Sequence, residues 1–406
     1  MKKSTIITIV AFVLGIIILG TGFVLLTDNN ISKKFRELMN KTTASTTTTT
    51  TTTTKPPRDT YEPMDLFKED ISKYVTLGDY KNMIVETEQI EASDEEVDMQ
   101  ISIILAIQKE FTKIREGNIG EKVIFSFDFT GYLTKEDGTK DKAFDGGAGT
   151  DQLAYIDGDT LYTLSSQGVG TFIPGFAEGM LNAKVGDTLD LNITFPEDYH
   201  SADLKGKKTI FEVKINYIAK LNFTDGWVKE YTKEEQKTCD EYREYIKGLM
   251  NDMVKDSNTE LLWSKITENA IINIPKQQFD YLYYNYRYQI EDYAAMFNMS
   301  YEDFFKSGYV SYLLGINLST DAELINYVND NLKYQLIMLA IIQAEDIKAT
   351  DEEYDIMLET LVEQTGKTEE EVLKQYSEEY IRQQIVLNKI DDVVYDLNDF
   401  VLKTEE

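Results

Sequence analysis

Residues 122–131 read KVIFSFDFTG, residues 188–195 read TLDLNITF and residues 208–217 read KTIFEVKINY. In each stretch apolar side chains alternate with polar ones, which is the period of a strand with one buried face. This alternation is typical of antiparallel sheets that pack on one side only. The three stretches therefore predict a compact antiparallel sheet, and PGFAEGML at 174–181 predicts one short helix beside it.

Glycine divides the folded part of the chain into two regimes. Thirteen of the 23 glycines lie between Gly120 and Gly206, where tight turns would join strands, and only four follow Trp227. Because glycine is disfavoured inside helices, the region after Trp227 predicts long helices. The predicted fold class is α+β, with one antiparallel sheet domain and its short helix inserted into, or attached to, an all-α body.

Several helix starts can be predicted from local sequence. A Ser or Thr followed three residues later by Glu forms a capping box, and such pairs begin at Ser93, Thr320, Thr350 and Thr368. Pro275 stands where another helix would begin, since proline is favoured in the first turn.

The N-terminus predicts a membrane anchor. Residues 4–27 are uncharged and apolar, and as a helix these 24 residues would span about 36 Å, enough to cross a ~30 Å hydrocarbon core. The run exceeds the ~7–15 apolar residues of a cleaved signal peptide, so an uncleaved transmembrane signal-anchor over 1–29 is favoured, with cleavage as the alternative. Lysines lie on both sides of the run, so the positive-inside rule does not decide its orientation. The start Lys2-Lys3 is typical of signal-anchors that export the rest of the chain, which favours a cytoplasmic N-terminus and an exported folded part.

A threonine-rich segment follows the anchor. Nine consecutive threonines, Thr46–Thr54, precede Lys55-Pro56-Pro57, a composition that favours an extended spacer over a packed core. The predicted boundaries are a stalk over 30–65, an arm with one helix over 66–118, the sheet domain over 119–220 and the helical domain over 221–406.

Composition excludes several classes of function. The chain has 71 acidic and 41 basic side chains, a net charge of −30, one cysteine and one histidine. The acid excess argues against a nucleic-acid-binding protein. A single Cys and a single His exclude a disulfide framework and His-rich metal sites, and they make a Ser-His-Asp triad a poor candidate.

Four short motifs occur in a fixed order: FDFTG at 127–131, FDGG at 144–147, FIPGF at 172–176 and FPEDYH at 195–200. This order resembles the FKBP-type peptidyl-prolyl cis-trans isomerase domain, in the variant found in bacterial trigger factor, and the similarity covers about 100 residues. Residues from about 222 onward resemble the helical chaperone body of that family. The family's ribosome-docking signature, Gly-Phe-Arg-x-Gly-Lys, does not occur here, so we expect a membrane-anchored member without ribosome docking.

The resemblance implies a set of site residues. The catalytic residues would be Phe176 as the floor of an apolar pocket, Asp145 near the twisting amide, and Phe211 and Phe129 in the wall. The substrate-binding residues would be Phe144, Tyr162, Phe172, Ile173, Tyr199 and His200. The resemblance implies no cofactor and no metal, and we expect Phe176→Ala to abolish catalysis while leaving the fold largely intact.

The implied function is a membrane-tethered, extracytoplasmic peptidyl-prolyl cis-trans isomerase and folding chaperone for exported or surface proteins. Its partners would be unfolded or nascent polypeptides with X-Pro bonds. One alternative is a non-catalytic holdase with a vestigial pocket, and another is a surface-displayed protein that uses the sheet domain only for interaction. The tyrosine-rich run FDYLYYNYRY at 279–288 has two interpretations, core packing or a client-holding surface.

Overall fold

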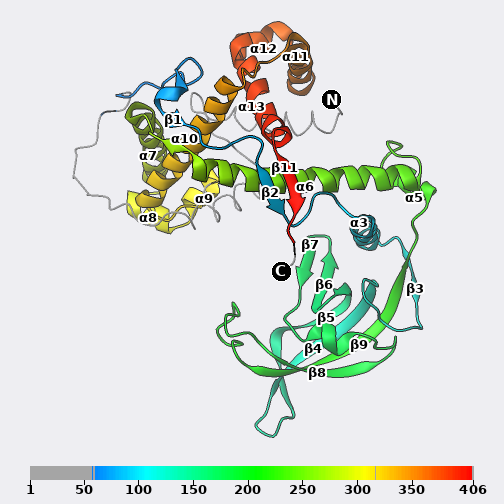
Figure 1. Cartoon of the computed structure of the whole chain (residues 1–406). Coiled ribbons are helices and arrows are strands. Elements are labelled where there is room, and N and C mark those ends of the chain that lie inside the picture. Colours follow the sequence, from blue (N-terminus) through cyan, green and yellow to red (C-terminus); the bar gives the residue numbers. More distant parts are fainter. Residues whose placement is uncertain (1–56, 58–59, 316, 405–406) are drawn as a thin grey trace. The chain divides into compact units, whose positions relative to one another are not determined.

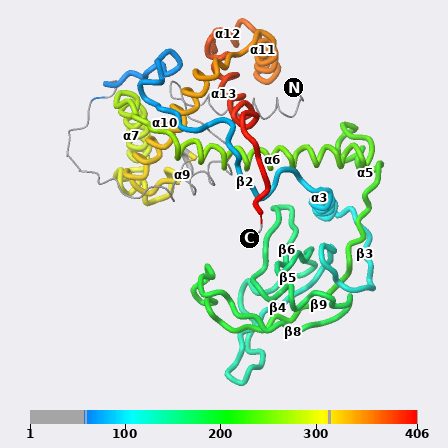
Figure 2. Tube along the Cα trace, in the orientation of Figure 1, coloured from blue at the N-terminus to red at the C-terminus, as the bar shows by residue number. Residues whose placement is uncertain are grey.

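The computed structural model describes residues 57, 60–315 and 317–404, and these form two compact units (Figure 1). The first unit, here the helical unit, contains the described residues up to Ile90 and those from Lys255 onward. The second, the sheet unit, is the continuous segment Glu91–Val254. The chain trace in Figure 2 shows blue, yellow and red segments together in the helical unit, so this unit is assembled from both ends of the chain.

The predicted anchor over 1–29 and most of the predicted stalk over 30–65 lie outside the described residues. Within the described part of the chain, no helix combines the length and apolar character needed to cross a membrane.

The sheet unit is built on a seven-stranded antiparallel sheet in the order β3-β9-β4-β5-β6-β7, with β8 paired to β9. Its strands are β3 (Phe111–Ile114), β4 (Phe125–Thr134), β5 (Lys140–Asp157), β6 (Thr160–Ser165), β7 (Gly168–Thr171), β8 (Thr188–Thr194) and β9 (Lys208–Leu221). The three alternating stretches of sequence are thus strands β4, β8 and β9, as predicted. Their apolar faces form one core that contains the fully buried Phe125, Phe127, Val213 and Ile215.

Helices complete the sheet unit. The predicted short helix is α4 (Phe176–Met180), whose Phe176, Ala177 and Met180 join the core of the sheet. The others are α3 (Asp94–Ile107), α5 (Asp225–Tyr231) and the first part of α6 (Cys239–Asn269). Apolar residues of these three helices, among them Val97, Val228 and Tyr242, share a second core.

The helical unit contains the remaining helices of the described chain. They are the rest of α6 with the short η1 (Ile71–Lys73), α7 (Lys276–Met296), α8 (Tyr301–Lys306), α9 (Tyr309–Leu314), α10 (Asp321–Ala344), α11 (Asp351–Thr365), α12 (Glu369–Gln375) and α13 (Glu378–Asp396). The main core joins η1, α6, α10 and α13. Helix α7 begins at Lys276, directly after Pro275, as predicted.

The helix caps follow the sequence closely. Complete capping boxes begin the three helices α3, α11 and α12 at Ser93, Thr350 and Thr368. At α10 the Thr320 hydroxyl accepts the Glu323 N–H, but the Glu323 carboxylate accepts the N–H of Ser319 instead, so only half of the predicted box forms.

The expectation of an all-α body needs correction, because the helical unit contains two small sheets. β1 (Val75–Thr76) pairs antiparallel with β10 (Ile271–Ile272), and β2 (Ile84–Thr87) pairs in parallel with β11 (Asp399–Leu402). Strands of two to four residues that pair with distant segments of the chain leave no recognisable pattern in the local sequence. Only the folded core brings these backbone segments together so that they satisfy each other's hydrogen bonds.

The tyrosine-rich run at 279–288 forms about half of α7 and largely packs in the interior. Tyr281, Tyr283, Tyr286 and Tyr288 are each less than 10% exposed. Tyr283 donates to the Asp321 carboxylate at 2.9 Å and accepts from the Arg287 guanidinium at 2.8 Å. The run therefore packs in the core rather than forming a continuous client-holding surface.

Candidate functional site

Six phenylalanines of the sheet unit form one aromatic cluster, defined by Phe129, Phe144, Phe172, Phe176, Phe195 and Phe211. The Phe176 ring lies at its centre, with ring centroids 4.6 Å from Phe172 and 4.8 Å from Phe211. Phe176 and Phe211 are 1% and 4% exposed, whereas Phe129, Phe144 and Phe172 are partly exposed. The cluster therefore has a buried floor and an accessible rim, which suits an apolar binding surface.

Local sequence explains how these rings meet. Phe129 and Phe211 lie on the inward face of β4 and β9, where alternation places every second side chain in the core. Phe176 is the first residue of α4, preceded by Gly175 in the left-handed conformation (φ 101°), which favours glycine. Gly175 thus lets the chain turn sharply from the FIPGF loop into the helix.

Two glycines make room for the Phe144 ring. A Cβ added to Gly147 would lie 2.4 Å from Phe144 Cε2, and one added to Gly131 would lie 2.5 Å from Phe144 Cζ. The Phe144 ring packs edge-on against Phe211, at 5.8 Å and an interplanar angle of 90°. The FDFTG and FDGG motifs thus supply both the ring and the space that it occupies.

The other predicted site residues lie at the edge of this cluster, with one exception described next. Ile173 and Tyr199 are partly buried and pack on the same core, and Tyr199 lies 4.6 Å from the Phe195 ring. His200 is exposed and packs on Tyr199 at 4.2 Å. Asp145 is an exposed residue next to Phe144 in β5.

Tyr162 does not join the aromatic cluster. It faces Tyr155 across the β5–β6 pair, and their rings stack at 4.9 Å within a separate core that includes residues of α3. The neighbouring residue Leu161 points into the main core instead. Side chains alternate along a strand, so one position along β6 decides which face a residue occupies.

Three residues absent from the predicted site contribute to its geometry. Phe195 contacts both Phe144 and Phe211, at 5.9 and 6.1 Å, and Gly131 and Gly147 leave space for Phe144. All three occur inside the FDFTG, FDGG and FPEDYH motifs. Each shares its motif with a predicted site residue, namely Phe129, Phe144 or Tyr199, and this was the signal that could have identified them.

The chemistry available at the cluster is limited to shape and apolar contact. Its members carry no nucleophile and no general acid, and the nearest predicted polar groups are Asp145 and His200 at the rim. Such a surface could bind an apolar or cyclic side chain through dispersion and burial.

Comparisons with known proteins agree with this geometry. A family model described as FKBP-type peptidyl-prolyl cis-trans isomerase matches residues 116–216, which include the whole aromatic cluster. The fold and the site therefore define an FKBP-type domain. A second model, described as the bacterial trigger factor protein C-terminus, matches residues 238–396.

Full-length relatives extend the match across both units. Trigger factor of Macrococcus caseolyticus is 30% identical over 313 residues, which covers 75% of this chain and 68% of that protein. Trigger factor of Halothermothrix orenii is 28% identical, covering 81% and 74% of the two chains. The chain belongs to the trigger factor family. A solved structure of the trigger factor chaperone aligns with 79% of this chain and 72% of its own chain, at 17% identity and a TM-score of 0.33.

Proposed function

We propose that the chain is a peptidyl-prolyl cis-trans isomerase and folding chaperone, and that the aromatic cluster binds the proline of an X-Pro bond. The aromatic cluster is the observation that carries the proposal. It presents partly exposed rings around the buried Phe176, and it lies inside the segment that matches the FKBP-type family.

The reaction suits a site of this kind. An X-Pro bond is planar through resonance, and its rotation is slow enough to limit folding, with a barrier of ~18–20 kcal/mol. Twisting the bond removes the resonance and its charge separation, so an apolar surface disfavours the planar form relative to the twisted one. We assign the floor of this surface to Phe176 and its walls to Phe129 and Phe211. Asp145 would act on the twisting amide from the rim.

We further propose that the protein is tethered to a bacterial cell membrane and acts on exported or surface proteins from the extracytoplasmic side. The uncharged run over 4–27 and the threonine-rich stalk support this proposal. Protease treatment of intact cells tests the location. Cleavage at the stalk in intact cells is expected, and protection until the cells are lysed would contradict it.

The isomerase proposal is tested by two matched substitutions, Phe176→Leu and Phe125→Leu. Both remove a buried ring from the same core, but Phe125 packs on Phe127 and is not part of the aromatic cluster. Leucine is preferable to alanine because Phe176 is 1% exposed, and truncation of a buried Phe to Ala costs about 3–5 kcal/mol. The burial of Phe176 therefore argues against the expectation that Phe176→Ala would leave the fold largely intact.

The assay is cis–trans isomerisation of a proline-containing tetrapeptide by the full chain, with folding checked by circular dichroism. We expect Phe176→Leu to lower kcat/KM at least tenfold and Phe125→Leu to leave it within about twofold, because only Phe176 belongs to the binding surface. Equal losses in the two variants would contradict the site. A folded wild-type chain that suppresses aggregation but catalyses no isomerisation would favour the holdase alternative.

A further inference from the structure

The outer face of the sheet lies opposite the aromatic cluster. Two β-bulges occur there, one on each side of β4, beside residues 126–129. Between Ser126 and Phe127 the β4–β9 register shifts by one residue, which leaves Asn216 as the extra residue in β9. Between Phe127 and Phe129 the β4–β5 register also shifts, in the region of Asp151. Bulges re-aim side chains and are frequent next to functional sites.

The two bulges build a polar network around Asp128. The Asp128 carboxylate accepts the backbone N–H of Asp151 at 2.8 Å and the side-chain amide of Asn216 at 2.7 Å. The Asp151 carboxylate accepts the hydroxyls of Ser126 at 2.6 Å and Tyr217 at 2.7 Å. These hydrogen bonds hold the pKa of Asp151 below its usual range, and the bond from Ser126 makes the largest contribution. Each of the two carboxylates thus already accepts two hydrogen bonds from within the network.

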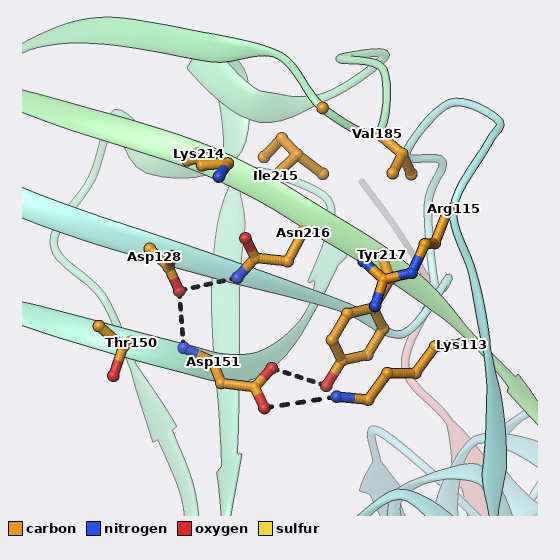
Figure 3. Close-up of a pocket in the computed structure, with 11 residues that line it drawn as sticks. Lys113, Arg115, Asp128, Thr150, Asp151, Val185, Lys214, Ile215, Asn216 and Tyr217 are labelled. Carbon is orange, nitrogen blue, oxygen red and sulfur yellow. Dashed lines mark hydrogen bonds and ion pairs between the residues drawn. The ribbon is translucent and has the colours of Figure 1, made fainter.

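An open pocket of about 480 Å³ lies over this network (Figure 3). Its walls carry three cationic side chains from different segments: Lys113 from β3, Arg115 just after it, and Lys214 from β9. Lys113 is partly engaged, since its ammonium lies 3.6 Å from the Asp151 carboxylate and 4.2 Å from the centre of the Tyr217 ring.

Lys214 and Arg115 are the unengaged cations of this pocket. Figure 3 shows dashed lines from Asp128, Asp151 and Lys113, and none from Lys214 or Arg115. Both side chains belong to exposed residues, and within the described residues neither has an ion-pair partner. The pocket is lined by three cationic side chains and two carboxylates, so it has one positive charge in excess. The chain as a whole has a net charge of −30.

We propose that this pocket is a second binding site, which takes the carboxylates of an acidic peptide segment. Charge complementarity favours an anion, because each pocket carboxylate already accepts two hydrogen bonds from within the network, while the ammonium of Lys214 and the guanidinium of Arg115 are free to donate. The volume of the pocket favours a peptide segment as the ligand rather than a single small ion, since pockets of about 300–1,000 Å³ accommodate molecules much larger than one carboxylate. The site relies on the proposed chaperone function for its ligand, and it does not involve the aromatic cluster.

Fluorescence anisotropy of a labelled, proline-free peptide tests the site on the full chain. The peptide alternates Glu and Ser and carries a neutral fluorophore, and a second peptide has Gln at every Glu. We expect the acidic peptide to bind at least tenfold more tightly than its Gln counterpart, and to weaken between 50 and 500 mM salt because exposed charges are screened. The double substitution Lys214→Gln/Arg115→Gln should lower the affinity at least tenfold.

Lys205→Gln/Lys208→Gln is the matched control, since both lysines are exposed, lie in the same unit and do not line the pocket. This control should bind the acidic peptide within twofold of the wild-type chain. Equal weakening by the two double variants, or equal binding of the two peptides, would overturn the proposal. Displacement of the peptide by inorganic phosphate at equal concentration would also overturn it, by showing a general oxyanion site. Tetrapeptide isomerisation is also measured for the same variants, so that a failure of the acidic-peptide site can be distinguished from a failure of the isomerase proposal.

Discussion

Replacing Gly131 by alanine should displace the rings of Phe144 and Phe211 in the aromatic cluster. Gly131 is buried in β4, opposite Phe211 of β9. A Cβ there would lie 2.5 Å from Phe144 Cζ and 2.7 Å from Phe211 Cε1, whereas carbon atoms pack at about 3.5–4.0 Å. The added methyl group therefore overlaps two aromatic rings by about 1 Å, and the rings can relieve the overlap only by moving.

The size of the effect follows from two opposing contributions. Overpacking of a core costs about 1–3 kcal/mol, and replacement of Gly by Ala recovers about 0.4–1 kcal/mol by restricting the unfolded chain. The difference spans about 0–2.6 kcal/mol, and because the added carbon meets two rings rather than one, we expect a net loss in the middle of that range, about 1–2 kcal/mol. Displacement of rings by about 1 Å can lower catalysis by as much as 10²-fold, so we expect kcat/KM to fall at least tenfold.

Two measurements on the full chain check these values. Hydrogen exchange of the β4 and β9 amides reports the local free energy of opening, and tetrapeptide isomerisation reports activity. Gly248→Ala is the control, because Gly248 lies inside α6 with no atom within 4 Å of an added Cβ, and there alanine should stabilise by about 0.5–1 kcal/mol. Unchanged exchange and activity in Gly131→Ala would refute the argument that these glycines seat the rings.

Three further predictions concern other parts of the fold. Thr350→Ala removes the capping box with Glu353 at α11 and should destabilise the helical unit by about 0.5–2 kcal/mol in urea unfolding, while Thr350→Ser should restore most of the loss. Asn258→Ala removes the side-chain amide that accepts from the buried Thr87 hydroxyl and donates to the Gln89 carbonyl, and it should cost about 1–3 kcal/mol in urea unfolding. An unchanged urea midpoint would contradict a stabilising role for these hydrogen bonds. Because the pKa of Asp151 is lowered in the folded state, its contribution is present above its unfolded pKa of about 3.9 and is lost as pH falls through the lower folded value. Acid unfolding of Asp151→Asn should therefore depend less on pH below about pH 4 than that of the wild-type chain.

Features set by local sequence could be predicted, and those set by distant pairing could not. Alternation along β4 and β9 and the caps at Ser93, Thr350 and Thr368 each depend on a few neighbouring residues. The β2–β11 pair depends on contacts across most of the chain, such as the Met83 N–H donating to Asn398, 315 residues away. No short pattern records such a contact.

The same distinction applies to the site. Motif order identified the rings that meet around Phe176, because each motif places its own ring locally. The face occupied by Tyr162 depends on where β5 and β6 turn. The polar pocket depends on bulges at Asp151 and Asn216, and a bulge is a property of the register between strands.

The helical unit is assembled from two stretches of chain that are separated by the sheet unit, and this affects the order of folding. Its core combines Ile71 and Val85 with residues of α10 and α13, so it cannot close until nearly the whole chain has been synthesised. The sheet unit is continuous from Glu91 to Val254, and a continuous segment can fold as soon as it emerges. Contacts of such high sequence separation also slow folding, because loop entropy must be lost before they form. The helical unit should therefore mature late, and strand β11, which pairs with β2 through residues 399–402, would be its last element to dock.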